Sequence, residues 1–381
     1  MKKKILFFSG SRADYGLLYP LISHFENNKK YTSKLFLSGH HFSKKYGVTY
    51  ENIKRKIKNI YKSKIRLKNT NNSNIIELIL ETAKELKNFL FKFKPHLLVI
   101  LGDRYELLSV TIPSFFLKIP ILHLHGGEKT TGAYDDVIRH VVSKFSNFHI
   151  VSDDVYKKRL IQLGENPKTI FNIGSIGSEL ALKSKKISFE DLRRKYHIYC
   201  EKYFLITYHP ETNNLQRSFV GLKNLLKVLE SLEEVNYIFT YNNTDTSGDV
   251  FLKEIKKFCK KNSNAKIYKN IGSSNYHNLA RHSRSVIGNS SSGVIEVPVL
   301  GVNTINIGKR QDGRIMSPSI INTTENFEDI LYAVKKVLKK KILYKNRIIK
   351  KNIIKNIIKR IKYILQIKKM GIKNFYDIKF K

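Results

Sequence analysis

The sequence predicts an α/β protein with two doubly wound domains, each with a parallel β-sheet covered by helices on both faces. Short, continuous apolar runs alternate with segments of helical periodicity, which is typical of parallel strands buried on both faces. This alternation pauses at residues 174–188, which carry glycine and small polar residues, and then restarts. The length of 381 residues is enough for two domains with separate hydrophobic cores.

The predicted elements follow from these runs in chain order. In the first half we predict strands at residues 5–9, 34–38, 97–101, 119–124 and 148–151, and helices at residues 17–26 and 75–93. In the second half we predict strands at residues 203–208, 237–240, 265–268, 285–287 and 304–307, and a helix at residues 215–232. The result is a pair of Rossmann-like domains, 1–178 and 179–345, that face a central cleft, with residues 174–188 as the interdomain linker.

Residues 346–381 form a basic C-terminal helical tail in this prediction. Ile349, Ile353, Ile357, Ile361 and Leu365 recur every four residues and define one apolar helix face. We favour a terminal helix that packs on the domains over a membrane role, and expect at most weak contact with a membrane surface. Because no catalytic motif lies in residues 366–381, we expect their removal to leave the chemistry largely intact.

Charge and composition limit the class of protein. The formal net charge is +39, and residues 331–381 supply much of it, with 18 Lys and Arg against the single acid Asp377. The remaining excess is scattered lysine among abundant Ile and Asn, so we predict no nucleic-acid partner. The apolar run after the first lysines is too short for a signal peptide, and no run reaches the roughly 20 residues that span a bilayer. We therefore expect a cytoplasmic protein, in which Cys200 and Cys259 are reduced thiols.

Polar and charged residues follow the carboxyl ends of several predicted strands. Open parallel sheets bind ligands at that end of their strands. The motifs are Ser9-Gly10-Ser11-Arg12-Ala13-Asp14-Tyr15-Gly16, Gly102-Asp103-Arg104-Tyr105-Glu106, His125-Gly126-Gly127-Glu128, Tyr134-Asp135-Asp136 with Arg139 and His140, His209-Pro210-Glu211-Thr212, and Gly288-Asn289-Ser290-Ser291-Ser292-Gly293-Val294-Ile295-Glu296. Charged groups gathered at one cleft indicate a polar ligand.

Each motif also has a structural interpretation. Residues 288–293 can form a turn with a serine N-cap, or a phosphate cradle made of backbone N–H groups at a helix N-terminus. Asp103 and Arg104 can form an ion pair with each other, and the motif histidines can be ordinary hydrogen-bonded side chains. Asp135 and Asp136 can stabilise the N-terminus of the following helix.

The functional interpretation gives these residues specific chemistry. Arg12 and the serine turn can hold a diphosphate, and Glu296 can accept the two hydroxyls of a ribose. Several acid/base groups remain for whatever lies beyond the diphosphate, namely Asp103, Glu128, Asp136 and His209. No cluster has metal-binding spacing, because the His-Gly-Gly-Glu motif lacks the second histidine of a zinc helix. We expect neither a metal nor another cofactor.

Taken in order, these motifs and Asn172-Ile173-Gly174-Ser175 resemble the hydrolysing UDP-N-acetylglucosamine 2-epimerases. The resemblance runs from about residue 3 to about residue 325. It is closest to the bacterial sialic-acid branch, through His125-Gly126-Gly127-Glu128-Lys129-Thr130, residues 172–177 and Phe375-Tyr376-Asp377-Ile378. A sister branch acts on UDP-N,N′-diacetylbacillosamine in legionaminic-acid synthesis. One departure is the segment Lys309-Arg310-Gln311-Asp312-Gly313-Arg314, where the family usually has Asp-Arg-Gln-Lys-Gly-Arg.

The resemblance implies a GT-B-like fold, the arrangement that many glycosyltransferases share, and conversion of UDP-N-acetylglucosamine and water to UDP and N-acetylmannosamine. It implies acid/base roles for Asp103, Glu128 and Asp136, and places His209 against the leaving diphosphate or its glycosidic oxygen. UDP contacts are implied for Arg12, Arg104, Ser290, Ser291, Glu296 and Arg310. We expect a UDP-sugar substrate and a homo-oligomer. A glycosyltransferase would share the fold and the UDP site but would also need an acceptor, and a non-catalytic adaptor would leave the cleft carboxylates without a purpose.

Overall fold

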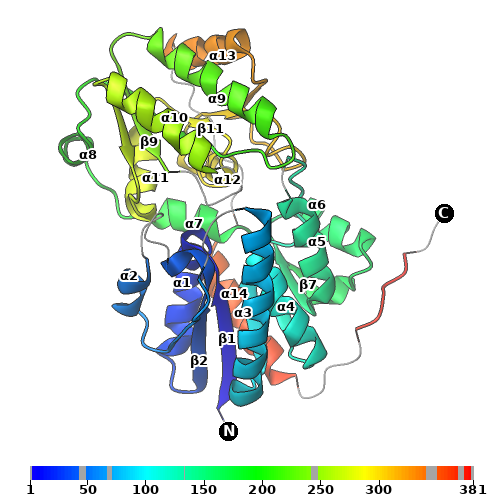
Figure 1. Cartoon of the computed structure of the whole chain (residues 1–381). Helices are drawn as coiled ribbons and strands as arrows, with labels where there is room; N and C mark the ends of the chain where they lie inside the picture. Colours follow the sequence, from blue (N-terminus) through cyan, green and yellow to red (C-terminus); the bar gives the residue numbers. More distant parts are fainter. Residues whose placement is uncertain are drawn as a thin grey trace. The chain divides into compact units, whose positions relative to one another are not determined.

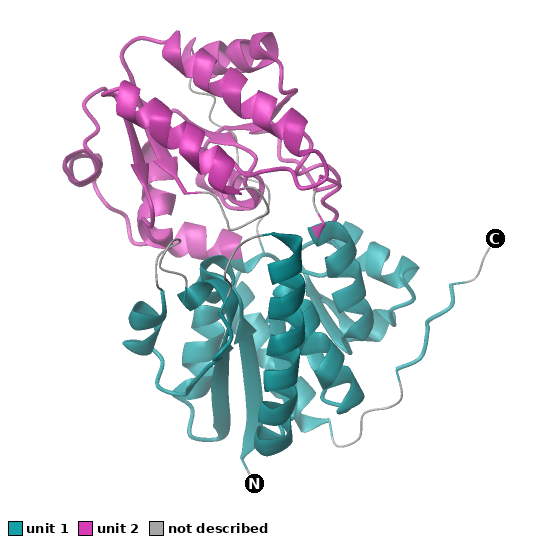
Figure 2. Cartoon of the chain, viewed as in Figure 1, with its two compact units in different colours: residues 1–128, 135–176, 350–381 teal, residues 129–134, 177–349 magenta. Residues whose placement is uncertain are grey.

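The protein forms two compact units, which are described separately below from a computed structural model (Figure 2). The structure describes residues 2–42, 49–66, 71–132, 134–241, 248–339, 350–367 and 373–378. Unit 1 comprises residues 1–128, 135–176 and 350–381, and unit 2 comprises residues 129–134 and 177–349. Compared with the predicted domains, residues 129–134 belong to unit 2 and residues 350–381 to unit 1. The predicted boundary at residues 345 and 346 lies outside the described residues.

Unit 1 contains a seven-stranded parallel sheet of order β3-β2-β1-β4-β5-β6-β7. Its strands are β1 (Lys3–Ser9), β2 (Tyr31–Leu37), β3 (Ile60–Lys62), β4 (Leu97–Leu101), β5 (Ile121–Leu124), β6 (Phe148–Val151) and β7 (Ile170–Asn172). Its helices are α1 (Arg12–Glu26), α2 (Tyr50–Lys54), α3 (Asn72–Phe93), α4 (Glu106–Phe116), α5 (Asp135–Phe145), α6 (Asp154–Gln162) and α14 (Ile353–Gln366). In Figure 1, α3 lies in front of this sheet and α14 behind it.

Unit 2 contains a six-stranded parallel sheet of order β10-β9-β8-β11-β12-β13. Its strands are β8 (Lys202–Thr207), β9 (Val235–Thr240), β10 (Ala265–Tyr268), β11 (Ser285–Gly288), β12 (Thr304–Ile307) and β13 (Ile320–Thr323). Its helices are α8 (Phe189–Tyr196), α9 (Leu215–Glu230), α10 (Gly248–Lys261), α11 (Ser273–His282), α12 (Ser291–Ile295) and α13 (Phe327–Lys339), and α7 (Ile176–Lys183) begins where the chain enters the unit. The prediction of two doubly wound α/β domains is thus confirmed.

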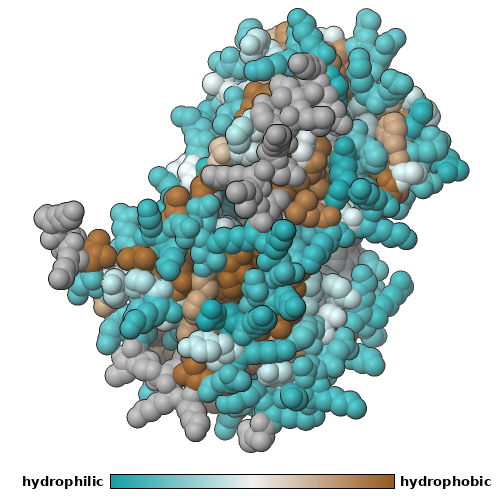
Figure 3. Space-filling view, turned by 180° about the vertical axis from the view of Figure 1, so that it is seen from behind, coloured by the Kyte–Doolittle hydropathy of each residue, from teal (hydrophilic) through white to brown (hydrophobic). Residues whose placement is uncertain are grey.

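Apolar side chains on both faces of each sheet explain why the strands form where they do. In unit 1, Leu98 and Ile100 of β4 and Phe36 of β2 are fully buried in one cluster with Leu86 and Leu90 of α3. The second sheet carries one buried cluster on each face, of which the larger includes helices α9, α10 and α13. On the face seen in Figure 3, hydrophilic residues dominate and hydrophobic residues occupy smaller areas between them, as expected for a lysine-rich chain.

The chain passes from unit 1 to unit 2 within the predicted linker, residues 174–188, and much of that segment is the helix α7. Its small polar residues do not hinder a helix, because Ala181 is fully buried and Glu179 lies in the first turn, where a negative charge is favourable.

The C-terminal helix α14 packs in unit 1, where it contacts α1. Ile353, Ile357, Ile361 and Leu365 are at most 4% exposed, so the predicted apolar face is buried; Ile349 lies outside the described residues. The guanidinium of Arg360 stacks 4.0 Å from the ring centroid of Phe171. Because this apolar face is buried, it cannot bind lipid. The amphipathic pattern of the tail therefore no longer supports contact with a membrane surface. In the part of the chain that the structure describes, no helix combines the length and apolar character needed to cross a bilayer.

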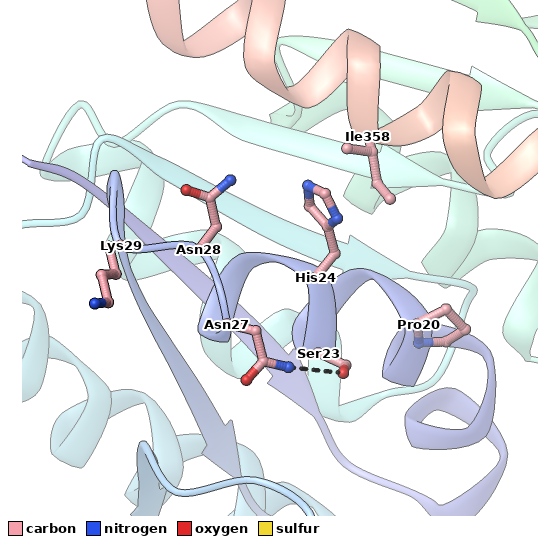
Figure 4. A pocket seen from close by; sticks show the side chains of 7 residues that line it. All are labelled: Pro20, Ser23, His24, Asn27, Asn28, Lys29 and Ile358. Atoms are coloured by element: carbon pink, nitrogen blue, oxygen red, sulfur yellow. Dashed lines mark hydrogen bonds between the residues drawn. The ribbon is translucent and has the colours of Figure 1, made fainter.

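A pocket of about 560 Å³ lies between α1 and α14 (Figure 4). It is lined by Pro20, Ser23, His24, Asn27, Asn28, Lys29 and Ile358. Burial, with a smaller contribution from Lys362, lowers the pKa of His24, so that Lys29 is the charged residue in this lining at neutral pH. None of the site residues predicted from the sequence lines this pocket, so the candidate site is elsewhere.

Candidate active site

Each sheet has a point where its strand order reverses, and the sequence motifs lie at both of these points. In unit 1 the neighbours β1 and β4 are followed by residues 9–14 and 102–106. In unit 2 the neighbours β8 and β11 are followed by residues 208–212 and 289–292. Chains leave such a pair of strands in opposite directions, which opens a crevice at the carboxyl ends where ligands of doubly wound sheets bind.

The loop after β1 is held by a capping box at the start of α1. Ser11 is the N-cap, and its hydroxyl donates to the Asp14 carboxylate at 2.6 Å. The same carboxylate accepts the backbone N–H groups of Gly10 and Ser11 at 3.2 and 2.9 Å. Asp14 therefore shapes the loop, while Arg12 follows the cap as an exposed residue at the helix N-terminus.

The two charged neighbours after β4 pair with different partners. Asp103 forms an ion pair with Arg139 of α5, and Arg104 donates from Nε to Glu106 at 3.2 Å. Glu106 is 2% exposed, and its other oxygen lies 3.1 Å from Nε2 of His40. Although burial raises the pKa of the Glu106 carboxyl, Arg104 and His40 lower it to about 2. Arg104 is therefore oriented by a buried, ionised carboxylate.

The depressed pKa of Glu106 predicts a stability difference that depends on pH. Glu106→Gln should destabilise the protein by about 3–5 kcal/mol at neutral pH, because it leaves Arg104 without its buried counter-ion. Glu106 stabilises the fold above its unfolded pKa, and this contribution is lost as the pH falls toward its folded pKa. The difference in unfolding free energy between wild type and Glu106→Gln should therefore become smaller as the pH falls from about 6 to about 3.

Urea unfolding across that pH range measures this difference. Glu201→Gln, at an exposed position, is the matched control and should show little difference at either end. A difference that stays constant with pH would contradict the charged, paired state of Glu106.

Arg139 brings together three carboxyl-bearing residues that the sequence analysis had singled out. Its side chain is 1% exposed and pairs with Asp103, lies 3.6 Å from Asp136, and donates to the backbone carbonyl of Glu128 at 2.9 Å. The Glu128 carboxylate accepts from, or shares a proton with, Nδ1 of His125 at 2.9 Å. Arg139 thus links Asp103 and Asp136 through their carboxylates and Glu128 through its backbone carbonyl. The acid/base roles of these residues stay a prediction.

A buried histidine connects the elements that carry these residues. His123 of β5 lies 2.7 Å from the carbonyl oxygen of Gly102 through Nε2 and 3.0 Å from the hydroxyl of Ser143 through Nδ1. Burial lowers the pKa of His123 to about 3, so the ring is neutral. It joins β4, β5 and α5, the elements that carry or directly precede the three carboxylates.

In unit 2, Asn289 organises the loops around His209. The Asn289 side chain accepts from the backbone N–H of His209 at 2.7 Å and donates to its carbonyl at 2.8 Å. The Asn289 carbonyl accepts from Arg310 and Gln311 at 3.2 and 2.9 Å. All four residues are at most 8% exposed. The predicted residues His209 and Arg310 therefore share one rigid centre.

The serine turn forms a helix N-cap, which is one of the two structures that the sequence allowed for residues 288–293. Ser290 caps α12 and accepts from the Ser292 N–H, and Ser291 is the first helical residue. Glu296 ends the helix and lies 2.9 Å from Nε2 of His277. The phosphate cradle stays a prediction.

Sequence reasoning gave no role to several residues that this geometry makes important. They are Arg139, His40, His123, His277, Asn289 and Gln311. Arg139 was quoted as part of a motif, and its position three residues after Asp136 on one helix face could have indicated the pairing. Among the described residues, no group of three or more His, Cys, Asp or Glu side chains is placed to hold a metal ion.

Comparisons with known proteins agree with this fold. A family model described as UDP-N-acetylglucosamine 2-epimerase matches residues 23–361. The chain is 39% identical to the GDP/UDP-N,N′-diacetylbacillosamine 2-epimerase (hydrolyzing) of Campylobacter jejuni, covering 85% of each chain. It is 35% identical to the polysialic acid biosynthesis protein P7 of Escherichia coli, covering 99% of this chain and 98% of that protein.

A solved structure shares the fold at lower identity. The UDP-GlcNAc 2-epimerase of Neisseria meningitidis, crystallised with UDP-GlcNAc, superimposes with a TM-score of 0.78 at 17% identity, covering 95% of this chain and 100% of that one. The extent of the family match and the identity to full-length relatives lead to one conclusion: this chain belongs to the UDP-N-acetylglucosamine 2-epimerase family.

Proposed function

We propose that this enzyme converts UDP-N-acetylglucosamine and water to UDP and N-acetylmannosamine, with inversion at C2, for the synthesis of sialic-acid-type sugars. The observation that carries the proposal is the set of residues that Arg139 links, the carboxylates of Asp103 and Asp136 and the backbone of Glu128, whose own carboxylate lies on His125. Inversion at carbon requires a base on one face of the sugar and an acid on the other, and this set supplies several groups that can serve. The name of the E. coli relative, which refers to polysialic acid, supports the pathway.

The reaction that fits these groups is an elimination followed by hydration. A carboxylate removes the C2 proton as the C1–O bond breaks, and UDP leaves with the bonding electrons to give a 2-acetamidoglycal. Water then adds its oxygen to C1 while an acid delivers a proton to C2 from the opposite face. Neither step changes an oxidation state, so the proposal needs no redox cofactor.

The remaining predicted residues take roles on the nucleotide. We assign to UDP the residues Arg12, Arg104, Ser290, Ser291, Glu296 and Arg310. His209 is assigned to the leaving diphosphate, where a hydrogen-bond donor stabilises the developing charge. The buried pairs of Arg104 with Glu106 and of Glu296 with His277 support these assignments, because they hold both side chains in fixed orientations.

A second substrate is favoured by one specific observation. The relative that is 39% identical to this chain is named for N,N′-diacetylbacillosamine, a sugar that differs from N-acetylglucosamine at C4 and C6. Incubating the pure protein with each UDP-sugar and identifying the products decides between the two. Turnover of the bacillosamine derivative alone would contradict the proposed substrate but not the proposed chemistry.

The elimination predicts the fate of two atoms. In heavy water, the N-acetylmannosamine product should carry deuterium at C2, because the original proton is lost to the enzyme and exchanges with solvent. In ¹⁸O-labelled water, the label should appear at C1 of the sugar and not in UDP, because the C1–O bond breaks. Mass spectrometry and proton NMR of the products measure both labels.

Two outcomes would contradict this route. Product that retains the original C2 proton would exclude the glycal intermediate. UDP release that requires a second sugar would indicate the glycosyltransferase alternative instead.

A further inference from the structure

The C-terminal segment, defined here as residues 373–378, packs within unit 1 through a partly buried lysine. The Lys373 ammonium lies 2.7 Å from the carboxylate of Glu165, which is 2% exposed. It also donates to three backbone carbonyls at the C-terminal end of α5, those of Ser143, Lys144 and Ser146. The Ser143 carbonyl also accepts the backbone N–H of Ser146 at 3.0 Å, whereas those of Lys144 and Ser146 lie beyond the regular hydrogen bonds of the helix. A cation on these carbonyls satisfies acceptors at the helix end and stabilises the negative end of the helix dipole.

An aromatic side chain fixes the same segment at a second point. The ring of Phe375 lies against Gly164, where a Cβ atom would overlap it, and the φ of Gly164 is +82°. The backbone N–H of Tyr376 donates to the Gly164 carbonyl at 2.9 Å. The ammonium of Lys144 lies 4.9 Å from the centroid of the Phe375 ring. The close approach of the ring to Gly164 and the hydrogen bond from Tyr376 therefore hold the segment at this point.

The Glu165 carboxylate that pairs with Lys373 is ionised at neutral pH. Burial raises the pKa of the Glu165 carboxyl, but hydrogen bonds from His149 and Lys373 lower it to about 2. Lys144 is a third donor to the same carboxylate, at 2.9 Å. Because Glu165 keeps two other partners, loss of Lys373 should leave it paired, and the main effect should fall on the carbonyls at the C-terminal end of α5.

Helix α5 carries residues of the proposed acid/base set at its other end. Asp136 lies in its first turn, and Arg139 one turn further on pairs with Asp103 and with the Glu128 carbonyl. The hydroxyl of Ser143, in its last turn, lies 3.0 Å from Nδ1 of His123. An α-helix of this length is about 16 Å long and moves as one body, so the anchor at its C-terminal end also fixes the carboxylates at its N-terminal end.

We propose that Lys373 is a positioning residue of the active site, which holds α5 so that Asp136 and Arg139 keep the geometry needed for proton transfer. The inference rests on the proposed function, because it assigns this set to catalysis. It reverses the expectation from sequence that residues 366–381 can be removed with little effect on the chemistry.

The test compares four proteins in steady-state UDP release from UDP-N-acetylglucosamine. Lys373→Met should lower kcat by about 5- to 50-fold, since small displacements of catalytic groups have effects of this size. Lys373→Arg, which keeps the cation, should retain most of the activity. Lys355→Met changes an exposed lysine of α14 and is the matched control, with wild-type kcat expected. The affinity for UDP should stay within about twofold in all of them, because none of the proposed UDP ligands is a residue of α5.

Two further measurements separate positioning from simple loss of stability. Lys373→Met combined with Asp136→Asn should lower kcat by less than the product of the two single effects, because both act through α5. Amide hydrogen exchange in residues 135–145 should be faster in Lys373→Met than in wild type. Phe375→Ala should give the same pattern and serves if Lys373→Met does not fold.

The outcomes distinguish this inference from the proposed function. Wild-type protein that does not turn over the UDP-sugar would contradict the proposed function, and exchange in α5 would then still report whether Lys373 anchors the helix. Wild-type kcat in both Lys373→Met and Phe375→Ala, or independent effects of Lys373 and Asp136, would overturn the inference.

Discussion

Glu128→Gln is expected to lower kcat by about 10²- to 10⁴-fold, which is the usual contribution of a positioned acid or base. Glutamine keeps the shape of the side chain and the space around His125 but cannot take or give a proton. Asp103→Asn should have an effect of similar size, because Arg139 links Asp103 to the same set of residues. Steady-state UDP release measures kcat for each variant.

The same variants should bind UDP with nearly unchanged affinity, since neither carboxylate is assigned to the nucleotide. Isothermal titration of UDP into each protein tests this. Glu233→Gln, at an exposed position in unit 2, controls for the loss of one negative charge and should behave as wild type in both assays. Full activity in Glu128→Gln would contradict the proposed site and leave only the fold and the family.

Gly288→Ala is expected to have the second large effect, on folding rather than on catalysis. Gly288 ends β11 with a φ of +134°, and a Cβ atom there would lie 2.7 Å from the carbonyl carbon of Thr207 and nearer still to its oxygen. Thr207 ends the neighbouring strand β8, so the backbone of either strand must move to make room. We expect a loss of more than about 3 kcal/mol in the stability of unit 2, with loss of UDP binding.

Gly16→Ala provides the matched control for this substitution. Gly16 lies within α1, and a Cβ atom there would meet no other atom within 4 Å. Alanine at this position should stabilise the helix by about 0.5–1 kcal/mol. Chemical unfolding compares the two variants, and an unchanged unfolding midpoint in Gly288→Ala would contradict the contact with Thr207.

The sequence was most informative about strands that carry a continuous apolar run. β4, β6, β10 and β12 have the predicted bounds. The physical reason is clearest in β4, whose residues are all apolar and buried, as expected for a parallel strand that is covered on both faces. The strands β3, β7 and β13 were missed. All three lie at sheet edges, where one neighbouring strand is absent and residues such as the half-buried Tyr61 and the exposed Asn322 break the apolar pattern.

The sequence predicts which strand ends carry the candidate residues but not what those residues contact. Strand ends meet at one edge of a parallel sheet whatever their order, so residues such as Asp103 and Glu128 could be assigned to the same region. Their partners depend on which helix passes above them. The pairing of Asp103 with Arg139, 36 positions later, required the placement of α5 on the sheet.

The discontinuity of unit 1 has a consequence for how the protein is made. Residues 350–381 complete unit 1, yet all of residues 177–349 precede them on the ribosome. At a typical 5–20 residues per second, roughly 10–35 s pass between the emergence of β7 and that of α14. During this interval unit 2 can fold as an autonomous insertion, while the nascent unit 1 still exposes the apolar surface that Ile357 and Ile361 will cover. We therefore expect chaperones to bind mainly to unit 1 during translation, because its first segment is made before unit 2 and its last segment after it.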